Sequence, residues 1–376
     1  MKVGLIGNYG ATNIGDDAIL QAILRSHPNH EFVVFSAHPS ETHEKFKVHS
    51  VPRFPLGLRS LWRQGFKSSI QALKECKAVV LGGGGLFQDN HLFACFLWAW
   101  QVYWVRKRGL PLFIYGIGIG PLRTRIGRWL THYAVDYAVG ITVRDQKSYD
   151  VLVQLGINPQ KMEVTADPAF TLLPQPFEEK TRQVHTYVVS LRPWKGQNQK
   201  LIDLFTRFLL KLKQEKSARF IFISMQSVQE HDHQILDPLA NRVGGDLVVP
   251  KDFSHLIEIL SQAEFAIGMR YHFTIAALMT RTPLLPISYS PKVTSVLGND
   301  LAPYLIPLEE LSLKKLEDAQ SLLSVEYNKF KRFAEHRAND QRDRAAKNIL
   351  YFEDWAKTLT TPPETDKLTQ HPTDDN

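Results

Sequence analysis

Cysteine is scarce in this sequence: the 376 residues contain only Cys76 and Cys95, and no CxxC pair. A disulfide framework and a cysteine-ligated zinc site are therefore excluded. So few cysteines are typical of proteins of the reducing cytoplasm, and we predict that location.

Long hydrophobic runs are also missing. The longest apolar run, Leu92 to Val105, is shorter than the roughly 20 residues that a bilayer-spanning helix needs. The stretch Met1 to Gly7 is too short and too bounded by glycine to be a signal-peptide core, so we predict a strand there. No transmembrane helix is predicted.

Negative charge is in deficit, since 38 Asp and Glu face 45 Lys and Arg, for a net charge of +7. A basic body suits anionic ligands or an anionic membrane surface. Nucleic acid is not predicted as a partner, because there is no RNP aromatic motif, zinc finger or extended Lys/Arg block. Neither half has an Asp-x-Asp pair for a metal-held sugar nucleotide, and no metal site is predicted.

What the sequence does contain is an alternation of short apolar strands with amphipathic helices, which is typical of parallel sheets covered on both faces. The predicted strands lie at residues 3–7, 31–36, 78–81, 111–116 and 140–144 in the first half, and at 185–191, 219–225, 246–249, 265–268 and 284–287 in the second.

This pattern predicts an α/β protein of two Rossmann-like, doubly wound domains that face a cleft. Residues 1–173 form the first predicted domain, and residues 185–359 form the second with terminal helices. Residues 174–184 are rich in Pro, Glu, Thr and Lys and are predicted as a linker. Residues 360–376 are predicted as a disordered tail.

Glycine gathers after three strands of the first half, in GNYGATNIGDD (7–17), GGGGLFQD (82–89) and GIGIGP (116–121). Because glycine permits tight turns and close approach, and parallel sheets bind ligands at the carboxyl ends of their strands, we expect a ligand here. The alternatives are a plain turn with Asp16 as helix N-cap, and close helix–strand packing. The candidate ligand-binding residues are Gly10, Asn13, Asp16, Gly83, Gly84, Asp89 and Gly118.

Polar residues at other strand ends would line the same cleft. They are Arg144, Asp167, Ser190, Arg192 and Arg270. An arginine at an apolar strand end is costly unless it meets a carboxylate or a phosphate. Arg144 could therefore equally form an ion pair with Asp145 or Asp167. His272 opens an apolar helix, where it could transfer protons or be a packed core residue.

Eight segments, in order along the chain, resemble the polysaccharide pyruvyl transferases. They are GATNIGDDAIL (10–20), GGGGLFQD (82–89), GIGIGPL (116–122), TVRD (142–145), ADP (166–168), VSLRPW (189–194), GMRYHFTIA (268–276) and YSPKV (289–293). VSLRPW and GMRYHF are most similar to the bacterial cell-wall type that anchors S-layers. Asp17 departs from the family pattern, which commonly has Glu at that place.

The resemblance implies a glycosyltransferase-B-like pair of Rossmann-type domains. It also implies transfer of pyruvate from phosphoenolpyruvate to two hydroxyls of one sugar, with phosphate released and a cyclic ketal formed. Phosphoenolpyruvate is then a co-substrate, and no cofactor is implied. For the cell-wall type the implied acceptor is N-acetylmannosamine in a lipid-linked or polymeric precursor at the cytoplasmic membrane face.

The resemblance also assigns roles to three residues. His272 is implied as the general acid that protonates the methylene carbon of phosphoenolpyruvate. Arg144 and Lys292 are implied as partners of its carboxylate and phosphate. Without the resemblance, Lys292 would be interpreted as an exposed loop lysine.

The residue pattern adds four candidates to these three. Arg192 and Arg270 are further partners for the anions on grounds of charge. Asp16 and Asp167 could hold acceptor hydroxyls or act as a base, and either could equally be a cap or an ion-pair partner.

A lipid-linked acceptor requires an approach to a membrane. The helix predicted over residues 92–108 is apolar and ends in Arg106-Lys107-Arg108, as in an interfacial helix whose cations reach lipid headgroups. We therefore expect peripheral contact with the inner face of the plasma membrane, involving Trp98 and Trp100. The alternative is a helix that only covers the sheet.

Two other functions stay open on the sequence. A glycosyltransferase that uses a nucleotide sugar would have the same architecture, because a fold does not fix the chemistry. A sugar-binding relative without turnover would keep the cleft. Phosphate release from phosphoenolpyruvate without a nucleotide would separate a pyruvyl transferase from both.

Overall fold

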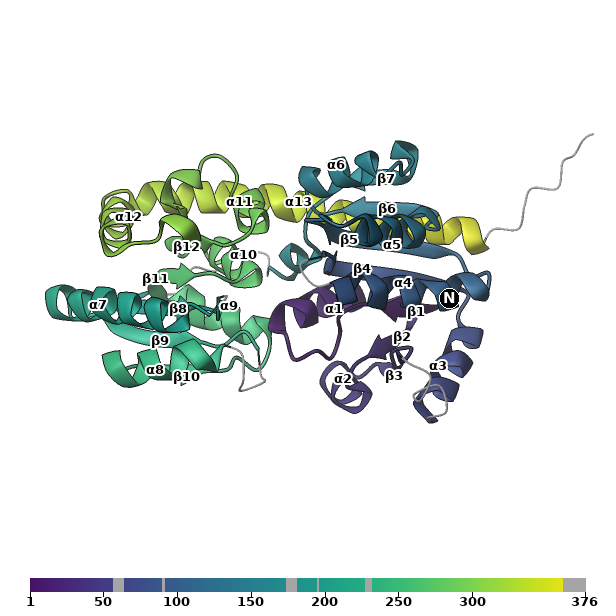
Figure 1. Cartoon of the computed structure of the whole chain (residues 1–376), viewed down its shortest axis with the longest axis horizontal. Coiled ribbons are helices and arrows are strands. Elements are labelled where there is room, and N and C mark those ends of the chain that lie inside the picture. The colour runs from purple at the N-terminus through teal and green to yellow at the C-terminus, as the bar shows by residue number, and fades with distance from the viewer. Residues whose placement is uncertain (57–63, 90–91, 174–180, 195, 227–231, 361–376) are drawn as a thin grey trace, which may run out of the picture.

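Two parallel β-sheets with helices packed on their faces make up the protein in the computed structural model, which is drawn in Figure 1. The structure describes residues 1–56, 64–89, 92–173, 181–194, 196–226 and 232–360. Most of the predicted linker, residues 174–180, and the predicted tail from 361 onward lie outside these ranges. In the described part of the chain, no helix is both long and apolar enough to cross a membrane.

The first sheet has the strand order β3-β2-β1-β4-β5-β6-β7, so the order reverses direction between β1 and β4. Its strands are β1 (Lys2–Ile6), β2 (Glu31–Ser36), β3 (His49–Pro52), β4 (Ala78–Phe87), β5 (Leu112–Ile119), β6 (Gly140–Val143) and β7 (Met162–Val164). Its helices are α1 (Ile14–Ser26), α2 (Pro39–Phe46), α3 (Gln64–Glu75), α4 (Leu92–Lys107), α5 (Arg125–Asp136) and α6 (Gln146–Gln154), with the 3-10 turns η2 (Pro159–Lys161) and η3 (Pro168–Leu172).

The second sheet has the order β10-β9-β8-β11-β12-β13, which reverses between β8 and β11. Its strands are β8 (Gln183–Ser190), β9 (Arg219–Ile223), β10 (Asp246–Val248), β11 (Ala263–Gly268), β12 (Leu284–Ser288) and β13 (Ile306–Pro307). Its helices are α7 (Asn198–Lys216), α8 (His233–Val243), α9 (Phe253–Gln262), α10 (Tyr271–Met279), α11 (Pro291–Leu297) and α12 (Leu313–Val325), with the 3-10 turns η4 (Ala302–Tyr304) and η5 (Leu308–Glu310).

Both sheets are buried on both faces, which explains the continuous apolar strands. Val79, Val80 and Leu81 of β4 are all inaccessible or nearly so, without the alternation that a half-exposed strand shows. Parallel sheets bind ligands where the strand order reverses, outside the carboxyl ends of the strands. The two reversal points are therefore the places where a site is expected.

Two glycine-rich segments, which were predicted to follow the ends of strands, belong to the strands themselves. Strand β4 runs through Gly82–Gly85, and β5 runs through Gly116 and Gly118. The register between β4 and β5 shifts between Gly84 and Phe87, and Gly83, Gly84 and Gly116 have positive φ. Only glycine adopts these conformations without strain, so the strands bend here rather than end.

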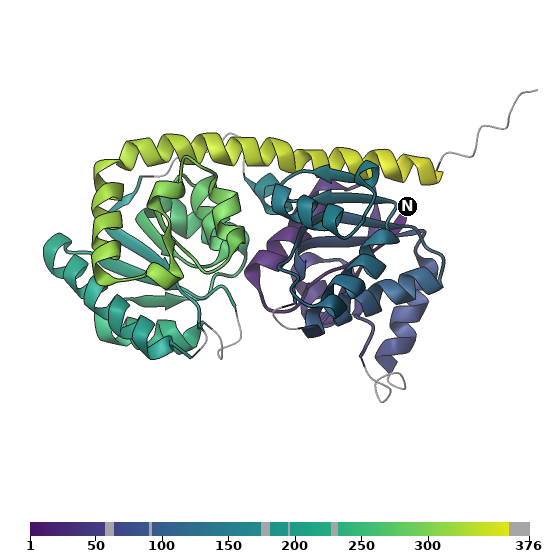
Figure 2. The same cartoon turned by 45° about the horizontal axis from the view of Figure 1, so that its top comes forward.

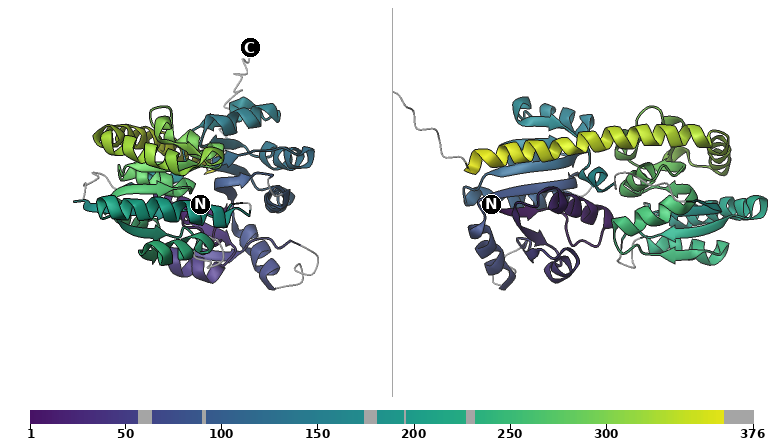
Figure 3. Two further views of the ribbon diagram at one scale, coloured as in Figure 1. Left: turned by 60° about the vertical axis from the view of Figure 1, so that its left-hand side comes forward. Right: turned by 180° about the vertical axis from the view of Figure 1, so that it is seen from behind.

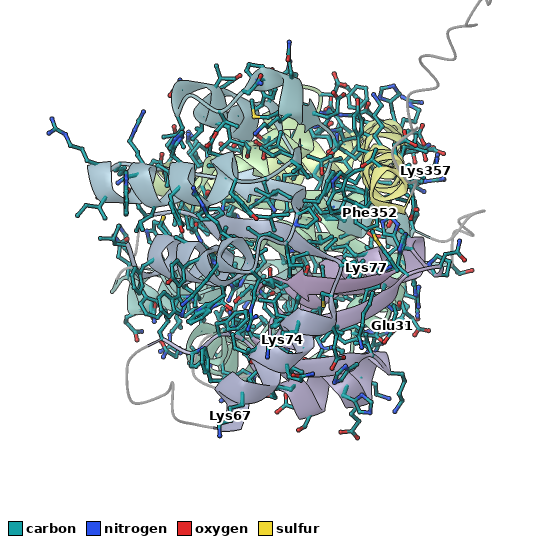
Figure 4. All side chains as sticks on the ribbon, turned by 90° about the vertical axis from the view of Figure 1, so that its right-hand side faces the viewer. Glu31, Lys67, Lys74, Lys77, Phe352 and Lys357 are labelled. Carbon is teal, nitrogen blue, oxygen red and sulfur yellow. The ribbon has the colours of Figure 1, made fainter. Side chains whose placement is uncertain are left out.

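The long helix α13 (Tyr327–Thr360) lies along both sheets, as Figures 2 and 3 show. Phe330 belongs to the core of the second sheet, whereas Phe352 and Ala356 belong to a core with β1 and β5. Figure 4 shows Phe352 between α13 and the first sheet. The sequence predicted that residues 185–359 belong to one domain, but the second half of α13 packs against the first sheet. Helical spacing does not reveal which sheet a residue will contact.

Helix α4 covers the first sheet. Trp98 is buried, and Trp100 is partly buried and donates its indole N–H to the Pro55 carbonyl at 3.0 Å. These two residues were expected to contact a membrane, and their side chains are instead used in packing, because a helix over a parallel sheet must bury one face. The exposed large apolar residues of α4 are different ones: Leu92, Phe93, Phe96 and Tyr103.

Candidate active site

A cavity of about 310 Å³ lies where the carboxyl ends of the two sheets meet. Residues of both sheets line it. Seven of the residues singled out in the sequence are among them: Asn13, Asp16, Arg144, Arg192, Arg270, His272 and Lys292. The fold therefore brings together residues that are up to 279 positions apart, from Asn13 to Lys292.

The loop after β1 joins the two halves of the cavity. Asn13 is the N-cap of α1, since its side chain accepts a hydrogen bond from the Gly15 N–H at 3.0 Å. Asp16, considered as this cap in the sequence, lies three residues further on, in the first turn of α1. The Ile14 N–H donates to the Met225 carbonyl of the second half at 3.1 Å. The loop thus forms one wall of the cavity and connects the first half of the molecule to the second.

Asp16 is a buried acid inside this wall. Asn8 donates its side-chain N–H to Asp16 at 2.8 Å. Burial raises the pKa of Asp16, and His272 and the hydrogen bond from Asn8 oppose that rise. A carboxylate with a raised pKa in a cavity is able to accept a proton from a substrate hydroxyl.

His272 and Arg144 are connected by one buried carboxylate. Asp167 accepts a hydrogen bond from Arg144 Nη1 at 3.0 Å, and its Oδ2 lies 3.7 Å from His272 Nε2. Burial alone would raise the pKa of Asp167, but His272 and Arg144 lower it below its usual range, so it remains ionised. Asp145, the alternative partner of Arg144, is farther away at 3.8 Å.

Arg144 is held on several sides. Its guanidinium lies 4.2 Å from the centroid of the Tyr271 ring. Burial alone would lower the pKa of Arg144, but Tyr271, Asp167 and Asp145 raise it. Within the described residues, the buried Nε of Arg144 and Nε2 of His272 make no hydrogen bond. Buried polar atoms without a partner are uncommon, and both residues line the cavity.

Lys292 reaches the same cavity from α11, and its ammonium donates to the Gln88 side chain at 3.2 Å. Burial, and after it the nearby Arg144 guanidinium, lower the pKa of Lys292 to about 7. No carboxylate forms an ion pair with it among the described residues. Lys292 is therefore a cation whose charge is costly in the free protein and is favoured by a bound anion.

Three glycines make room for these side chains. A Cβ at Gly15 would lie 2.0 Å from His272 Nδ1, one at Gly85 would lie 2.3 Å from Lys292 Nζ, and one at Gly118 would lie 2.5 Å from Arg144 Nε. The glycine-rich segments led us to expect that a ligand approaches the backbone closely here. The structure shows that side chains of the site make that approach.

Two arginines at the cavity have partners of their own. Arg270 donates from Nε to Asp232 at 3.2 Å and from Nη2 to Gln226 at 3.1 Å. Arg192 donates to the Tyr289 hydroxyl at 3.1 Å and lies over that ring. Arg270 is thus fixed by a carboxylate, whereas the partners of Arg192 in the described part of the chain are a neutral hydroxyl and a ring.

The remaining candidates are outside the cavity lining. Asp89 accepts hydrogen bonds from the backbone of Arg123 and Thr124, and Ser190 donates to the Ile223 carbonyl. Gly83 packs on Ile19, and Gly10 lies beside Ser36. Gly84 and Gly118 lie behind the wall, against Asp16 and Arg144. These residues shape the backbone around the site. They were chosen for their position at a strand end, which does not decide where a side chain points.

Four polar lining residues were not among the candidates chosen from the sequence: Asn8, Gln88, Tyr271 and Tyr289. Each of them contacts an ionisable group of the site, and each lies inside a segment quoted from the sequence, which is the signal that could have indicated it. Among the described residues, no three His, Cys, Asp or Glu side chains are grouped so that they could hold a metal ion.

The model of a family described as polysaccharide pyruvyl transferase matches residues 13–291, which include every cavity residue predicted from the sequence except Lys292. The chain belongs to the polysaccharide pyruvyl transferase family. This confirms the family resemblance drawn from the eight segments. The assignment to the S-layer-anchoring type stays a prediction.

Several solved structures have a fold similar to that of this chain. UDP-GlcNAc 2-epimerase from Neisseria meningitidis, bound to UDP-GlcNAc, matches with a TM-score of 0.62 at 12% identity. The match covers 94% of this chain and 100% of the epimerase chain. S. aureus MnaA with UDP has a TM-score of 0.64 at 12% identity, covering 96% and 98%. Anabaena HepE with UDP and glucose has a TM-score of 0.60 at 13% identity, covering 96% and 99%.

At these identities the neighbours show the fold alone. They confirm the expected α/β architecture, in which two Rossmann-like units face a cleft as in the glycosyltransferase-B-like enzymes. Membership of this family indicates a transferase that acts on a polysaccharide or a sugar acceptor.

Proposed function

We propose that this protein transfers the pyruvyl unit of phosphoenolpyruvate to two hydroxyls of one sugar, forming a cyclic ketal and releasing phosphate. The observation that carries the proposal is the grouping of His272, Arg144 and Lys292 around one cavity. Phosphoenolpyruvate has a carboxylate and a phosphate close together, and such a ligand requires two cations and a proton donor.

The first step is protonation of the methylene carbon. His272 as imidazolium gives its proton to that carbon, which becomes a methyl group, and C2 becomes electrophilic. Asp167 stabilises the imidazolium before transfer, because it stays ionised 3.7 Å from Nε2. A first sugar hydroxyl then adds to C2 and passes its proton to the Asp16 carboxylate.

The second step is displacement of phosphate. A second hydroxyl of the same sugar attacks C2, the C2–O bond to phosphate breaks with its electron pair, and the second hydroxyl proton leaves with phosphate or solvent. Arg144 and Lys292 stabilise the negative charge that develops on the phosphate. Asp16 is the residue we propose to accept a hydroxyl proton, since its pKa is raised by burial.

We further propose N-acetylmannosamine of a cell-wall precursor as the acceptor, and a peripheral location at the inner face of the plasma membrane. The support for the acceptor is the similarity of VSLRPW (189–194) and GMRYHF (268–273) to the cell-wall type. No bound cofactor takes part in the proposed steps.

The test is phosphate release from phosphoenolpyruvate by the purified protein, with and without an N-acetylmannosamine-terminated acceptor. We expect acceptor-dependent release, and we expect His272→Ala to lower kcat by at least about 100-fold, as for loss of a general acid. His336→Ala is the matched control, because His336 is exposed on α13. It should leave the rate unchanged.

Thermal protection separates the alternatives. If phosphoenolpyruvate raises the Tm but no tested acceptor supports release, the donor is supported and the proposed acceptor is wrong. If a nucleotide sugar protects the protein and phosphoenolpyruvate does not, the proposed reaction is overturned in favour of a glycosyltransferase. Tight phosphoenolpyruvate binding without release for any sugar would indicate a binding protein.

A further inference from the structure

The outer faces of α4 and α5 form an apolar surface, which we call the α4–α5 face. On α4, Leu92, Phe93 and Phe96 are 37%, 65% and 48% exposed. On α5, Ile126 and Trp129 are 57% and 64% exposed. Exposed apolar side chains are normal when they are scattered, but a group of large ones marks an interaction site.

The two helices pack side by side, so these residues belong to one surface. The Thr131 hydroxyl of α5 donates to Cys95 Sγ of α4 at 3.9 Å. Further along, the Arg106 guanidinium of α4 lies 5.2 Å from the Tyr133 ring centroid of α5. Figure 1 shows α4 and α5 next to each other on the first sheet.

The charge around this face is mainly positive. Residues 90–135 contain no Asp or Glu, and the one acid of α4 and α5 is Asp136, the last residue of α5. The same stretch contains six exposed cations: Arg106, Lys107, Arg108, Arg123, Arg125 and Arg128. Aromatic side chains flanked by arginine and lysine are typical of surfaces that lie in the headgroup region of a bilayer.

The α4–α5 face continues into the wall of the cavity. Phe93 is exposed on the face and also lines the cavity, together with Ala94 and Leu97 of the same helix. A surface that bound the α4–α5 face would therefore lie beside the cavity opening. A sugar anchored in that surface could enter the cavity without leaving it.

We propose that the α4–α5 face binds an anionic lipid bilayer. The purpose of such binding, which is to bring a lipid-linked acceptor to the cavity, rests on the proposed function. The observations on the α4–α5 face do not depend on that function. A second copy of the chain fits less well, because two such faces packed together would bring their cations against each other.

The test is co-sedimentation with vesicles of phosphatidylcholine alone and of phosphatidylcholine mixed with phosphatidylglycerol. The wild-type protein is expected to bind the phosphatidylglycerol vesicles, and added NaCl should weaken that binding. The double variants Phe96→Ser/Trp129→Ser and Arg125→Gln/Arg128→Gln should each lower the partition coefficient by at least about tenfold.

Matched controls change the same kinds of residue elsewhere. Val325→Ser/Leu350→Ser removes exposed apolar side chains, and Lys200→Gln/Lys314→Gln removes exposed cations. Both controls should bind vesicles as the wild type does. All variants should keep the wild-type Tm and, with a water-soluble acceptor, the wild-type rate of phosphate release, so membrane binding and catalysis are measured separately.

The proposal is overturned if the wild type does not bind phosphatidylglycerol vesicles, or if both test variants bind as well as their controls. It is also overturned if the wild type forms a dimer without lipid that Phe96→Ser/Trp129→Ser abolishes, and no vesicle binding is seen. Vesicle binding that depends on these residues supports it, even if no phosphate release is found with any acceptor.

Discussion

A single methyl group at one of three glycines would displace an ionisable side chain of the site. Gly15, Gly85 and Gly118 lie against His272, Lys292 and Arg144, at distances that a Cβ does not permit. None of the three has positive φ, so their requirement for glycine comes from space and not from backbone conformation. The glycine-rich motifs of this chain thus position side chains as well as bending the backbone.

We expect Gly85→Ala to raise the KM for phosphoenolpyruvate by about tenfold or more while changing the Tm little. The new Cβ would contact the end of the flexible Lys292 side chain, which can move away without unfolding the protein. Steady-state kinetics of phosphate release and a thermal melt measure the two effects. Gly65→Ala in α3 is the control, because there the new Cβ would lie 3.3 Å from Pro52 and far from the site. An unchanged KM would contradict the role given to Gly85.

The lowered pKa of Lys292 predicts a pH dependence of phosphoenolpyruvate binding. Lys292 is cationic below a pKa of about 7 and neutral above it. Because the cation binds the anionic substrate, affinity is expected to fall as pH rises through this value, by up to about tenfold per pH unit. Titration calorimetry across this range measures the change.

Lys292→Arg provides the test of that assignment. Arginine stays charged throughout the range, so the loss of affinity at alkaline pH should disappear in this variant. If the variant shows the same decrease as the wild type, another group causes it, and the role of Lys292 as anion partner is wrong.

Helix α13 positions a loop of the site as well as covering the sheets. Asn348 of α13 is fully buried, accepts from the Thr165 hydroxyl at 2.8 Å and donates to the Ala166 carbonyl at 3.0 Å. The next residue is Asp167, which contacts both His272 and Arg144. A helix that does not itself line the cavity thus fixes the backbone beside a residue that connects two groups of the site.

Asn348→Ala should therefore lower both stability and activity. Loss of these buried hydrogen bonds is expected to destabilise the protein by about 1–3 kcal/mol. Since the Asp167 loop loses its anchor, kcat should fall while the KM for phosphoenolpyruvate changes less. Denaturant titration and steady-state kinetics check this. Asn339→Ala, on the same helix, is the control. An unchanged kcat would limit Asn348 to a structural role.

The two halves of the molecule are joined at several places. Ile14 hydrogen-bonds to Met225 across the cavity, Asn13 forms a β-bridge with Gln226, and α13 has core residues in both halves. The site is completed only where the halves meet, since Asp16 and Arg144 come from the first and His272 and Lys292 from the second.

We expect the full chain to unfold in one cooperative transition by calorimetry. A chain that ends after residue 346 lacks Phe352 and Ala356, and so exposes Phe113 and Tyr115 of β5. It should show two transitions, with the first domain melting at the lower temperature. The control is a chain that ends at Thr360 and keeps all of α13. One transition in the shorter chain would show that α13 does not couple the domains.

The sequence by itself determined the family and the central strands. Strand and helix alternation depends on local hydrophobic patterns, and these predicted the apolar strands such as β4 and β8. The short edge strands β3, β7 and β13 were not predicted, because two to four residues carry little of such a pattern. The motifs around Arg144, His272 and Lys292 identified the residues of the site, because the family resemblance is a property of contiguous segments. The candidates chosen only for strand-end position, such as Asp89 and Ser190, were not brought into the cavity lining.

Only the tertiary structure decided which groups meet. That Asp167 rather than Asp145 lies nearest to Arg144, that Gly85 makes room for Lys292, and that Phe352 packs on the first sheet all depend on contacts between distant segments. The same is true of α4, whose pattern is apolar on nearly all sides. The sheet beneath it decides that Trp98 is buried and Phe96 exposed, since a hydrophobic residue carries no local information about which apolar partner will cover it.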